Sequence, residues 1–171
     1  MNKINTLILD ACCGAKMMWF DKQNPLTLFN DIRELETNLC DGREFSVSPD
    51  VTYDFTNLDF PDCKFKLVVF DPPHLNKIGD DAWMAIKYGK LPEDWREMLS
   101  NGFAECFRVL ENNGILIFKW NEIQIKTTQI LDCVEFAPLF GHPSGKRADT
   151  HWIVFMKNES MRKDNKCEEA A

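Results

Sequence analysis

Residues 67–74 read Leu-Val-Val-Phe-Asp-Pro-Pro-His, an apolar stretch followed by a carboxylate, two prolines and an imidazole. A short apolar run that stops at turn-forming residues predicts a central strand of a parallel sheet, because both faces of such a strand are covered. Ligands of open α/β sheets bind beyond the carboxyl ends of the strands. We therefore expect residues 71–74 to lie in a ligand site.

The tetrapeptide Asp71-Pro72-Pro73-His74 places hydrogen-bond acceptors beside a flat ring. The prolines have a fixed φ and no N–H, so the main chain turns rigidly and presents carbonyl oxygens without competing donors. Acceptors next to a stacking ring suit a planar group with an exocyclic NH2, such as a nucleobase. Asp and Pro are also common turn residues, so the tetrapeptide could simply end a strand.

Polar residues follow three other strand-like segments. Residues 7–9 lead into the small-residue loop Asp10-Ala11-Cys12-Cys13-Gly14, where a ligand can approach the backbone closely. Asp31 follows about twenty residues later, the spacing at which an acid meets ribose hydroxyls in nucleotide-binding folds. Asp54 and Phe55 follow a third such segment. Each acid alone could cap a helix or lie in a solvated turn, but four strand ends in this order predict one shared site.

Together these motifs resemble those of class I S-adenosylmethionine (SAM)-dependent methyltransferases, over about residues 5–157. The tetrapeptide is similar to the (Asp/Asn/Ser)-Pro-Pro-(Tyr/Phe/Trp/His) motif of enzymes that methylate amino groups of nucleic-acid bases. The chain departs from that pattern at Cys12-Cys13-Gly14, in place of a multi-glycine loop, and at His74, in place of the usual Tyr, Phe or Trp. It also resembles the short methyltransferases of bacterial prophages.

The resemblance implies that SAM is the cofactor, and it assigns the cofactor-binding residues. Asp10, Ala11, Cys12 and Gly14 would shape the site of the methionine end. Asp31 would bind the ribose hydroxyls, while Asp54 and Phe55 would meet the adenine amine and ring.

The same resemblance places the acceptor at the tetrapeptide. Asp71 and the Pro72 carbonyl would accept the two amino hydrogens, and Pro73 would complete the rigid turn. His74 would stack on the base, with a partial positive charge if its pKa keeps the usual value of about 6.5.

The alternation of strand-like and helix-like segments predicts a Rossmann-like, doubly wound α/β fold with a mostly parallel sheet. The resemblance implies seven strands, of which the last pair is antiparallel. The expected strands are 7–10, 26–31, 51–54, 66–71, 114–119, 134–140 and 151–157. The expected helices are a short one after Gly14, an amphipathic one over 94–110 and one over 122–133, and residues 32–50 form an irregular or hairpin-like insertion.

Roughly twenty residues separate His74 from the helix at 94, a length typical of a lid or binding loop. Lys77, Trp83, Lys87 and Tyr88 are our candidates there for substrate contact. The segments 77–90 and 141–152 combine basic and aromatic residues, which could follow a nucleic-acid backbone and stack on bases. They could equally be solvated loops.

With 171 residues, 44% hydrophobic and 27% charged, the composition predicts one domain over 1–157, followed by a polar tail over 158–171 without structure. We expect a cytoplasmic protein without membrane contact, because the sequence shows no leader and no long apolar run. Seven cysteines without C-x-x-C spacing predict reduced thiols and no metal site. A net charge of −7 argues against unaided binding of long duplexes.

Two alternatives stay open at this stage. Lys119 with Asp71 could deprotonate a ribose or small-molecule hydroxyl, with Lys16 and Glu122 as further candidates. The chain could also be a cofactor-binding scaffold without catalytic activity. For amino-group transfer, adenine N6 is the first choice, followed by guanine N2 and cytosine N4. The nucleic acid could be DNA or RNA, with or without a partner protein that supplies recognition.

Overall fold

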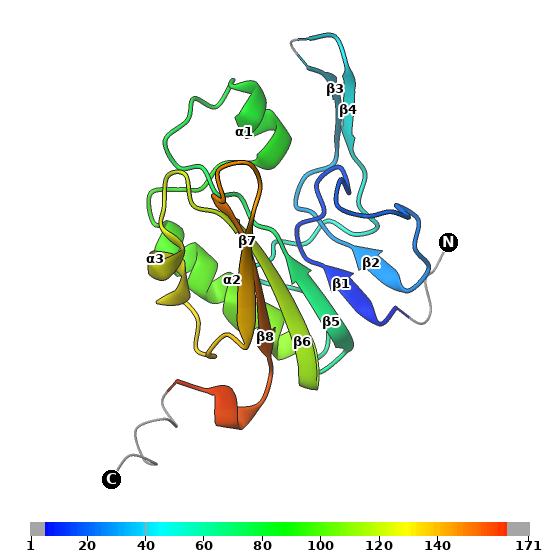
Figure 1. The fold of residues 1–171 in the computed structure, drawn as a ribbon. Helices are drawn as coiled ribbons and strands as arrows, with labels where there is room; N and C mark the ends of the chain where they lie inside the picture. Colours follow the sequence, from blue (N-terminus) through cyan, green and yellow to red (C-terminus); the bar gives the residue numbers. More distant parts are fainter. Residues whose placement is uncertain (1–5, 40, 164–171) are drawn as a thin grey trace.

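A computed structural model describes residues 6–39 and 41–163 of the chain. Its centre is a six-stranded sheet in the order β2-β1-β5-β6-β8-β7 (Figure 1). The strands of this sheet are β1 (Ile8–Asp10), β2 (Thr27–Phe29), β5 (Phe65–Phe70), β6 (Leu110–Asn121), β7 (Phe140–Ser144) and β8 (Thr150–Met156). The first four run parallel to one another, whereas β8 is antiparallel to β6 and β7 is antiparallel to β8. The mostly parallel sheet and the antiparallel last pair are therefore confirmed.

A separate hairpin projects from the sheet (Figure 1). It consists of β3 (Leu35–Asn38) and β4 (Glu44–Val47), which pair antiparallel. The hairpin-like insertion expected within residues 32–50 is confirmed.

The prediction of seven strands is wrong, because the strand expected over residues 51–54 does not form. Only one parallel bridge, between Asn30 and Val51, remains where residues 51–54 would extend the sheet. The buried amide side chain of Asn30 explains the loss, because it takes the main-chain groups that a strand would pair. Its Oδ1 accepts the N–H of Tyr53 at 2.8 Å, and its Nδ2 donates to the Tyr53 carbonyl at 3.0 Å.

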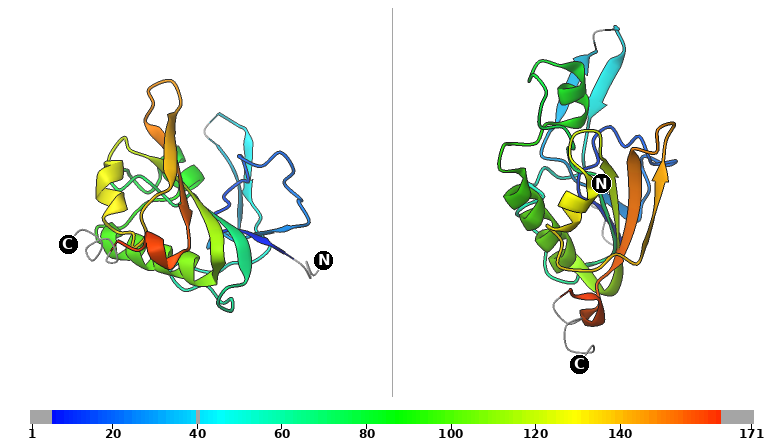
Figure 2. Two further views of the ribbon diagram at one scale, coloured as in Figure 1. Left: turned by 60° about the horizontal axis from the view of Figure 1, so that its bottom comes forward. Right: turned by 60° about the vertical axis from the view of Figure 1, so that its left-hand side comes forward.

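The described residues form three α-helices, as many as expected. They are α1 (Trp83–Tyr88), α2 (Trp95–Val109) and α3 (Thr127–Leu131), and a 3-10 turn spans Glu159–Met161. However, α1 was not predicted, and the other two are shorter than predicted. The amphipathic helix expected over 94–110 is confirmed as α2, and the helix expected over 122–133 is reduced to α3. Figure 2 shows α2 and α3 on the same face of the sheet. Since no α-helix of the described residues covers the opposite face, the doubly wound arrangement is not formed.

The helix expected after Gly14 is also absent, and turns connect β1 to β2. Trp19 from this connection packs edge-on against Phe29, with ring centroids 5.1 Å apart, and the ammonium of Lys16 lies 4.4 Å from the centre of the Phe29 ring. These two side chains cover the end of β2 that a helix would otherwise shield.

The C-terminal part differs from the expectation as well. The strand expected over 134–140 begins only at Phe140, and residues 135–137 pair instead with the segment near Arg162. The Ala137 N–H donates to the Met161 carbonyl, and the Lys163 N–H donates to the Glu135 carbonyl. Residues 158–163 are thus part of the fold, whereas the rest of the predicted polar tail, residues 164–171, lies outside the described residues.

The core lies between α2 and strands β5, β6 and β8. Phe103 of α2 contacts Phe70 and Phe118 edge-on, with centroid distances of 5.2 and 4.9 Å. All three rings are at most 1% exposed. In the described part of the chain, no helix is long and apolar enough to cross a bilayer.

Gly102 lets α2 approach the core closely, which yields a first prediction. A Cβ at this position would lie 2.7 Å from Phe55 Cδ2 and 3.0 Å from Phe70 Cζ. Because both rings are buried, Gly102→Val should lower the free energy of unfolding by about 2 kcal/mol, as expected for overpacking. The measurement is urea unfolding followed by circular dichroism.

Gly79→Ala is the control, since a Cβ there meets nothing within 4 Å. We expect it to change the unfolding free energy by less than about 0.5 kcal/mol. A Gly102→Val variant as stable as the wild type would contradict the close packing of α2.

Candidate functional site

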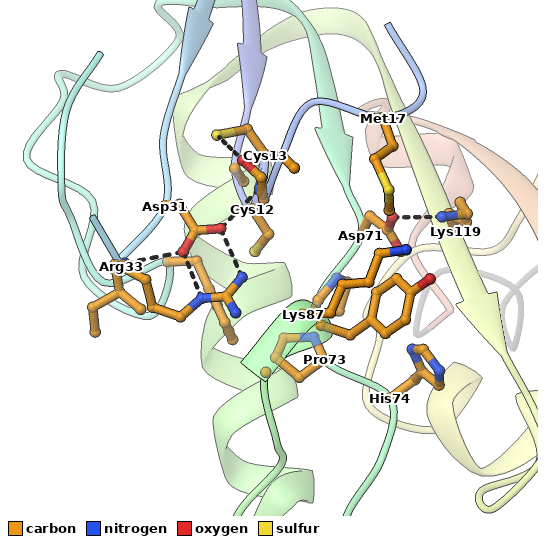
Figure 3. Close-up of a pocket in the computed structure, with 18 of the residues that line it drawn as sticks. Cys12, Cys13, Met17, Asp31, Arg33, Asp71, Pro73, His74, Lys87 and Lys119 are labelled. Carbon is orange, nitrogen blue, oxygen red and sulfur yellow. Dashed lines mark hydrogen bonds and ion pairs between the residues drawn. The ribbon is translucent and has the colours of Figure 1, made fainter. Parts of the chain in front are cut away.

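A cavity of about 420 Å³ opens at the carboxyl ends of β1, β2, β5 and β6 (Figure 3). Nearly all the predicted site residues line it, although they come from distant parts of the sequence. They are Ala11, Cys12, Gly14, Asp31, Phe55, Asp71, Pro72, Pro73 and His74. Asp10 and Asp54 do not line the cavity.

Asp54 folds back on its own turn. Its Oδ1 accepts hydrogen bonds from the N–H and the hydroxyl of Thr56, both at 2.8 Å. This geometry holds the turn that places Phe55 in the cavity wall.

Asp10 lies fully buried at the end of β1. Its Oδ2 accepts the indole N–H of Trp19 at 2.6 Å, and its Oδ1 accepts the N–H of Cys12 at 3.3 Å. Burial raises the pKa of Asp10 to about 7, and the charges of Asp71 and Asp31 add to this effect against the opposing Trp19 hydrogen bond. Asp10 therefore braces the loop between β1 and β2, and Trp19 is a partner that sequence reasoning missed.

Asp31 is 5% exposed and faces the cavity from the end of β2. Its Oδ2 accepts the N–H of Gly14 at 2.9 Å, so it holds the small-residue loop. Its Oδ1 accepts both the main-chain N–H and the Nε–H of Arg33 at 3.0 Å. Arg33 was not among the predicted residues, although the Asp-x-Arg spacing next to a site acid was a usable signal.

Asp71 is paired with a cation from the neighbouring strand. The Lys119 Nζ donates to Asp71 Oδ2 at 2.6 Å, and both side chains line the cavity (Figure 3). Burial raises the pKa of Asp71, and the Lys119 charge opposes the shift. The ammonium of Lys119 also lies 5.7 Å from the ring centre of Trp152.

His74 lies among aromatic rings, with its centroid 5.9 Å from that of Tyr88 and 6.3 Å from that of Trp120. Burial, together with the charge of Lys119, lowers the pKa of His74 to about 4. The imidazole is therefore neutral at pH 7, so the condition set for a partial positive charge, a pKa near the usual value, is not met. A neutral ring can still stack on a base.

The segment between His74 and α2 forms one wall of the cavity. Lys87 and Tyr88 from α1 line it, whereas the other two substrate candidates, Lys77 and Trp83, do not. Gly89 has a φ of 77°, and a Cβ there would lie 2.8 Å from Pro73 Cγ. This close contact seats the segment, which we call the lid (residues 76–90), directly on the tetrapeptide.

The segment 141–152 and the cysteines contribute little to the cavity chemistry. From the basic and aromatic segment 141–152, Thr150 is the residue that lines the cavity. Burial raises the pKa of Cys12 and Cys106 well above the usual thiol range, so both thiols stay protonated. Within residues 6–39 and 41–163, no three His, Cys, Asp or Glu side chains come together as a metal site would require.

The fold is shared with SAM-dependent methyltransferases. A protein from Pyrococcus horikoshii aligns with 91% of this chain and 84% of its own at 14% identity, with a TM-score of 0.58. A TehB-like SAM-dependent methyltransferase from Corynebacterium glutamicum aligns over 88% and 79% at 17% identity, with a TM-score of 0.55. No protein-family profile and no curated protein sequence matches the chain.

A third similar structure contains two bound small molecules. It is the 1,6-didemethyltoxoflavin N1-methyltransferase from Burkholderia thailandensis, with 1,6-didemethyltoxoflavin and S-adenosylhomocysteine bound. It aligns with 91% of this chain and 72% of its own at 13% identity, with a TM-score of 0.55. At such identities the likeness establishes the class of fold.

The buried carboxyl of Asp10 yields a second prediction. Its pKa of about 7 in the folded state lies above the ordinary value of 3.8, so the folded protein binds more protons between these values. Stability must therefore fall as pH rises from 4 to 7, by at most about 1.4 kcal/mol per pH unit from this group. In Asp10→Asn this slope should disappear, so the variant gains stability relative to wild type between pH 5 and pH 8.

Urea unfolding at several pH values measures this difference. Asp41→Asn is the matched control, because Arg43 lowers the pKa of Asp41 and its titration lies below pH 4. An Asp10→Asn variant whose stability follows the wild-type pH curve would show that Asp10 is ionised throughout.

Proposed function

We propose that this protein transfers a methyl group from SAM to an exocyclic amino group of a nucleic-acid base, with adenine N6 favoured. The observation that carries the proposal is the shared cavity. Residues that resemble a SAM site and residues that resemble an amino-acceptor site line the same 420 Å³ space. Donor and acceptor can then meet with water excluded, which methyl transfer by direct displacement requires.

The cofactor residues have the chemistry that a nucleoside needs. Asp31 is a buried carboxylate aimed into the cavity, and Phe55 supplies an apolar ring from the loop after Tyr53. A Cβ at Gly14 would meet nothing within 4 Å, so the backbone there is open to a ligand. When bound, SAM would supply an electrophilic methyl group on its sulfonium.

The tetrapeptide offers two acceptor oxygens, Asp71 Oδ1 and the Pro72 carbonyl. Within the described residues, Asp71 Oδ1 and the Pro72 carbonyl accept no hydrogen bond, whereas Asp71 Oδ2 is held by Lys119. Two acceptors for two amino hydrogens would draw the nitrogen toward a tetrahedral geometry and direct its lone pair at the methyl group. Asp71 Oδ1 is then placed to take the proton that the amine loses.

The proposal that the substrate is a nucleic-acid base rests on the tetrapeptide and on the cavity residues around it. The neutral ring of His74 and the ring of Tyr88 supply stacking surface, and Lys87 supplies positive charge beside them. With a net charge of −7, the protein suits a single-stranded or already exposed base, or a complex with a recognition partner. The Burkholderia neighbour binds a small heterocycle, so a small-molecule acceptor is an outcome that a substrate screen must include.

A second candidate is methyl transfer to a hydroxyl group, for which the close Lys119–Asp71 pair is the supporting observation. The other residues considered for it lie elsewhere. Lys16 covers the Phe29 ring, and the Glu122 carboxylate accepts the N–H of Thr127 at 3.1 Å. Neither lines the cavity. Amino-group transfer is therefore the better supported chemistry.

The roles of the two cavity acids can be separated by substitution. Asp31→Ala should weaken S-adenosylhomocysteine binding at least about tenfold, because a buried acceptor for the ribose is lost. Asp71→Ala should keep that affinity within about threefold while lowering methyl transfer at least about a hundredfold. Isothermal titration calorimetry and transfer of radiolabelled methyl groups to single-stranded DNA and RNA measure the two effects.

Asp41→Ala is the control for both assays, since Asp41 lies in the β3–β4 turn outside the cavity. If wild-type protein binds neither SAM nor S-adenosylhomocysteine, the proposed function is wrong. If Asp71→Ala transfers methyl groups at the wild-type rate, the acceptor assignment is wrong.

Lys119→Met distinguishes the two acceptor chemistries. If the protein methylates amino groups, the rate of methyl transfer at neutral pH should fall about tenfold in this variant. The acid limb of its pH–rate profile should also move to higher pH. The acid limb moves in this direction because the Lys119 charge lowers the pKa of Asp71. Without Lys119, Asp71 keeps its proton to a higher pH. Hydroxyl transfer would instead be abolished, because the base itself would be missing.

A further inference from the structure

Arg33 lies between the lid and Asp31, the carboxylate proposed to bind the cofactor ribose. Its guanidinium lines the cavity and contacts Asp31 on one side and α1 on the other (Figure 3). The Nε and Nη2 donate to the two carboxylate oxygens of Asp31 at 3.0 and 3.2 Å. The Nη1 donates to the main-chain carbonyl of Ile86 at 3.1 Å.

The carboxylate of Asp31 has no acceptor capacity left in this arrangement. A carboxylate offers about four lone-pair sites. The N–H of Gly14 and the Nη2 of Arg33 take Oδ2, while the main-chain N–H and the Nε of Arg33 take Oδ1. A ribose diol that approaches Asp31 must therefore replace the Arg33 side chain.

The Arg33 side chain also binds the lid through a hydrogen bond. Its contact at the Ile86 carbonyl joins residues far apart in sequence. Gly89, three residues further along, seats the lid against Pro73, and a Cβ at Gly89 would lie 3.9 Å from Arg33 Nη1. The hydrogen bond to Ile86 is exposed, so its strength depends on how firmly Asp31 orients the guanidinium.

We propose that Arg33 is an internal latch that occupies the ribose-binding carboxylate in the free protein, holds the lid over the cavity, and is exchanged for the cofactor ribose. The inference rests on the proposed function, because it assumes that Asp31 binds a ribose. The hydroxyls of the cofactor replace Nε and Nη2 on Asp31. Arg33 then loses its anchor, and the lid is freed for entry of the acceptor.

This exchange imposes an order on the reaction. The lid carries Lys87 and Tyr88, which form the acceptor side of the cavity. While Arg33 is latched, these residues are held close to the tetrapeptide. Cofactor binding releases them, so the acceptor binds second. Arg33 is thus a positioning residue that couples the two halves of the cavity.

Calorimetric titration with S-adenosylhomocysteine tests the exchange. Arg33→Met removes the competitor and leaves the Asp31 carboxylate free, so binding should tighten about fivefold relative to wild type. Arg33→Lys keeps the charge but cannot bridge both oxygens of Asp31 and Ile86, so its affinity should lie between the two. Arg43→Met is a matched control, because Arg43 makes the same i, i+2 contacts to Asp41 in the β3–β4 turn.

Hydrogen–deuterium exchange of the lid tests the tether. In wild-type protein, S-adenosylhomocysteine should increase amide exchange over residues 83–89 while it protects residues 11–14. In Arg33→Met the lid should exchange at this faster rate without ligand, and Arg43→Met should behave as wild type. Circular dichroism of each variant confirms that it is folded.

The outcomes separate the latch from the proposed function. If wild type binds S-adenosylhomocysteine and Arg33→Met binds it equally or more weakly, the latch is overturned and the cofactor assignment stands. Lid exchange that slows on ligand binding in wild type also overturns the latch. If neither protein binds the ligand, the proposed function fails, and the latch fails with it.

Discussion

The structure depends on how it accommodates three carboxylates at one edge of the sheet. Asp10 is the last residue of β1, while Asp31 and Asp71 follow β2 and β5. These three strands are adjacent and parallel, so the carboxylates converge. Each is largely shielded from water, and like charges at short range in such surroundings are costly. The protein resolves this differently for each acid. Asp10 has a pKa near neutrality, Asp31 binds Arg33, and Asp71 binds Lys119.

These three solutions organise the rest of the site. The hydrogen bonds that Asp10 accepts from the Trp19 indole and the Cys12 N–H hold the loop after β1. The cations on Asp31 and Asp71 connect them to other elements, since Arg33 reaches α1 and Lys119 comes from β6. The charge of Lys119 also helps keep His74 neutral. Lys119 thus influences the pKa of both Asp71 and His74, in addition to burial.

Turns rather than a helix connect β1 to β2. Loops with Trp19 and Lys16 replace the helix after β1, and a hairpin follows β2. Turns and the Asn30 amide hold the loop around Tyr53, whereas α2 and its phenylalanine core support β5 and β6. The carboxyl ends of the strands keep their positions because the parallel ladder is intact. A reduced helical layer is therefore compatible with the cavity.

The sequence by itself determined the mostly parallel α/β class and nine of the residues that line the cavity. Strand ends marked by Asp31 and Asp71 are local signals, and the parallel order of strands brings them together without further information. The same holds for α2, whose apolar spacing is local. The missing strand at 51–54 and the late start of β7 could not be predicted, because a distant side chain or segment satisfies the main chain there. Only the tertiary structure decided the partners of Arg33 and the lowered pKa of His74. A pKa depends on burial and on charges from distant strands, and neither is encoded in any single stretch of the chain.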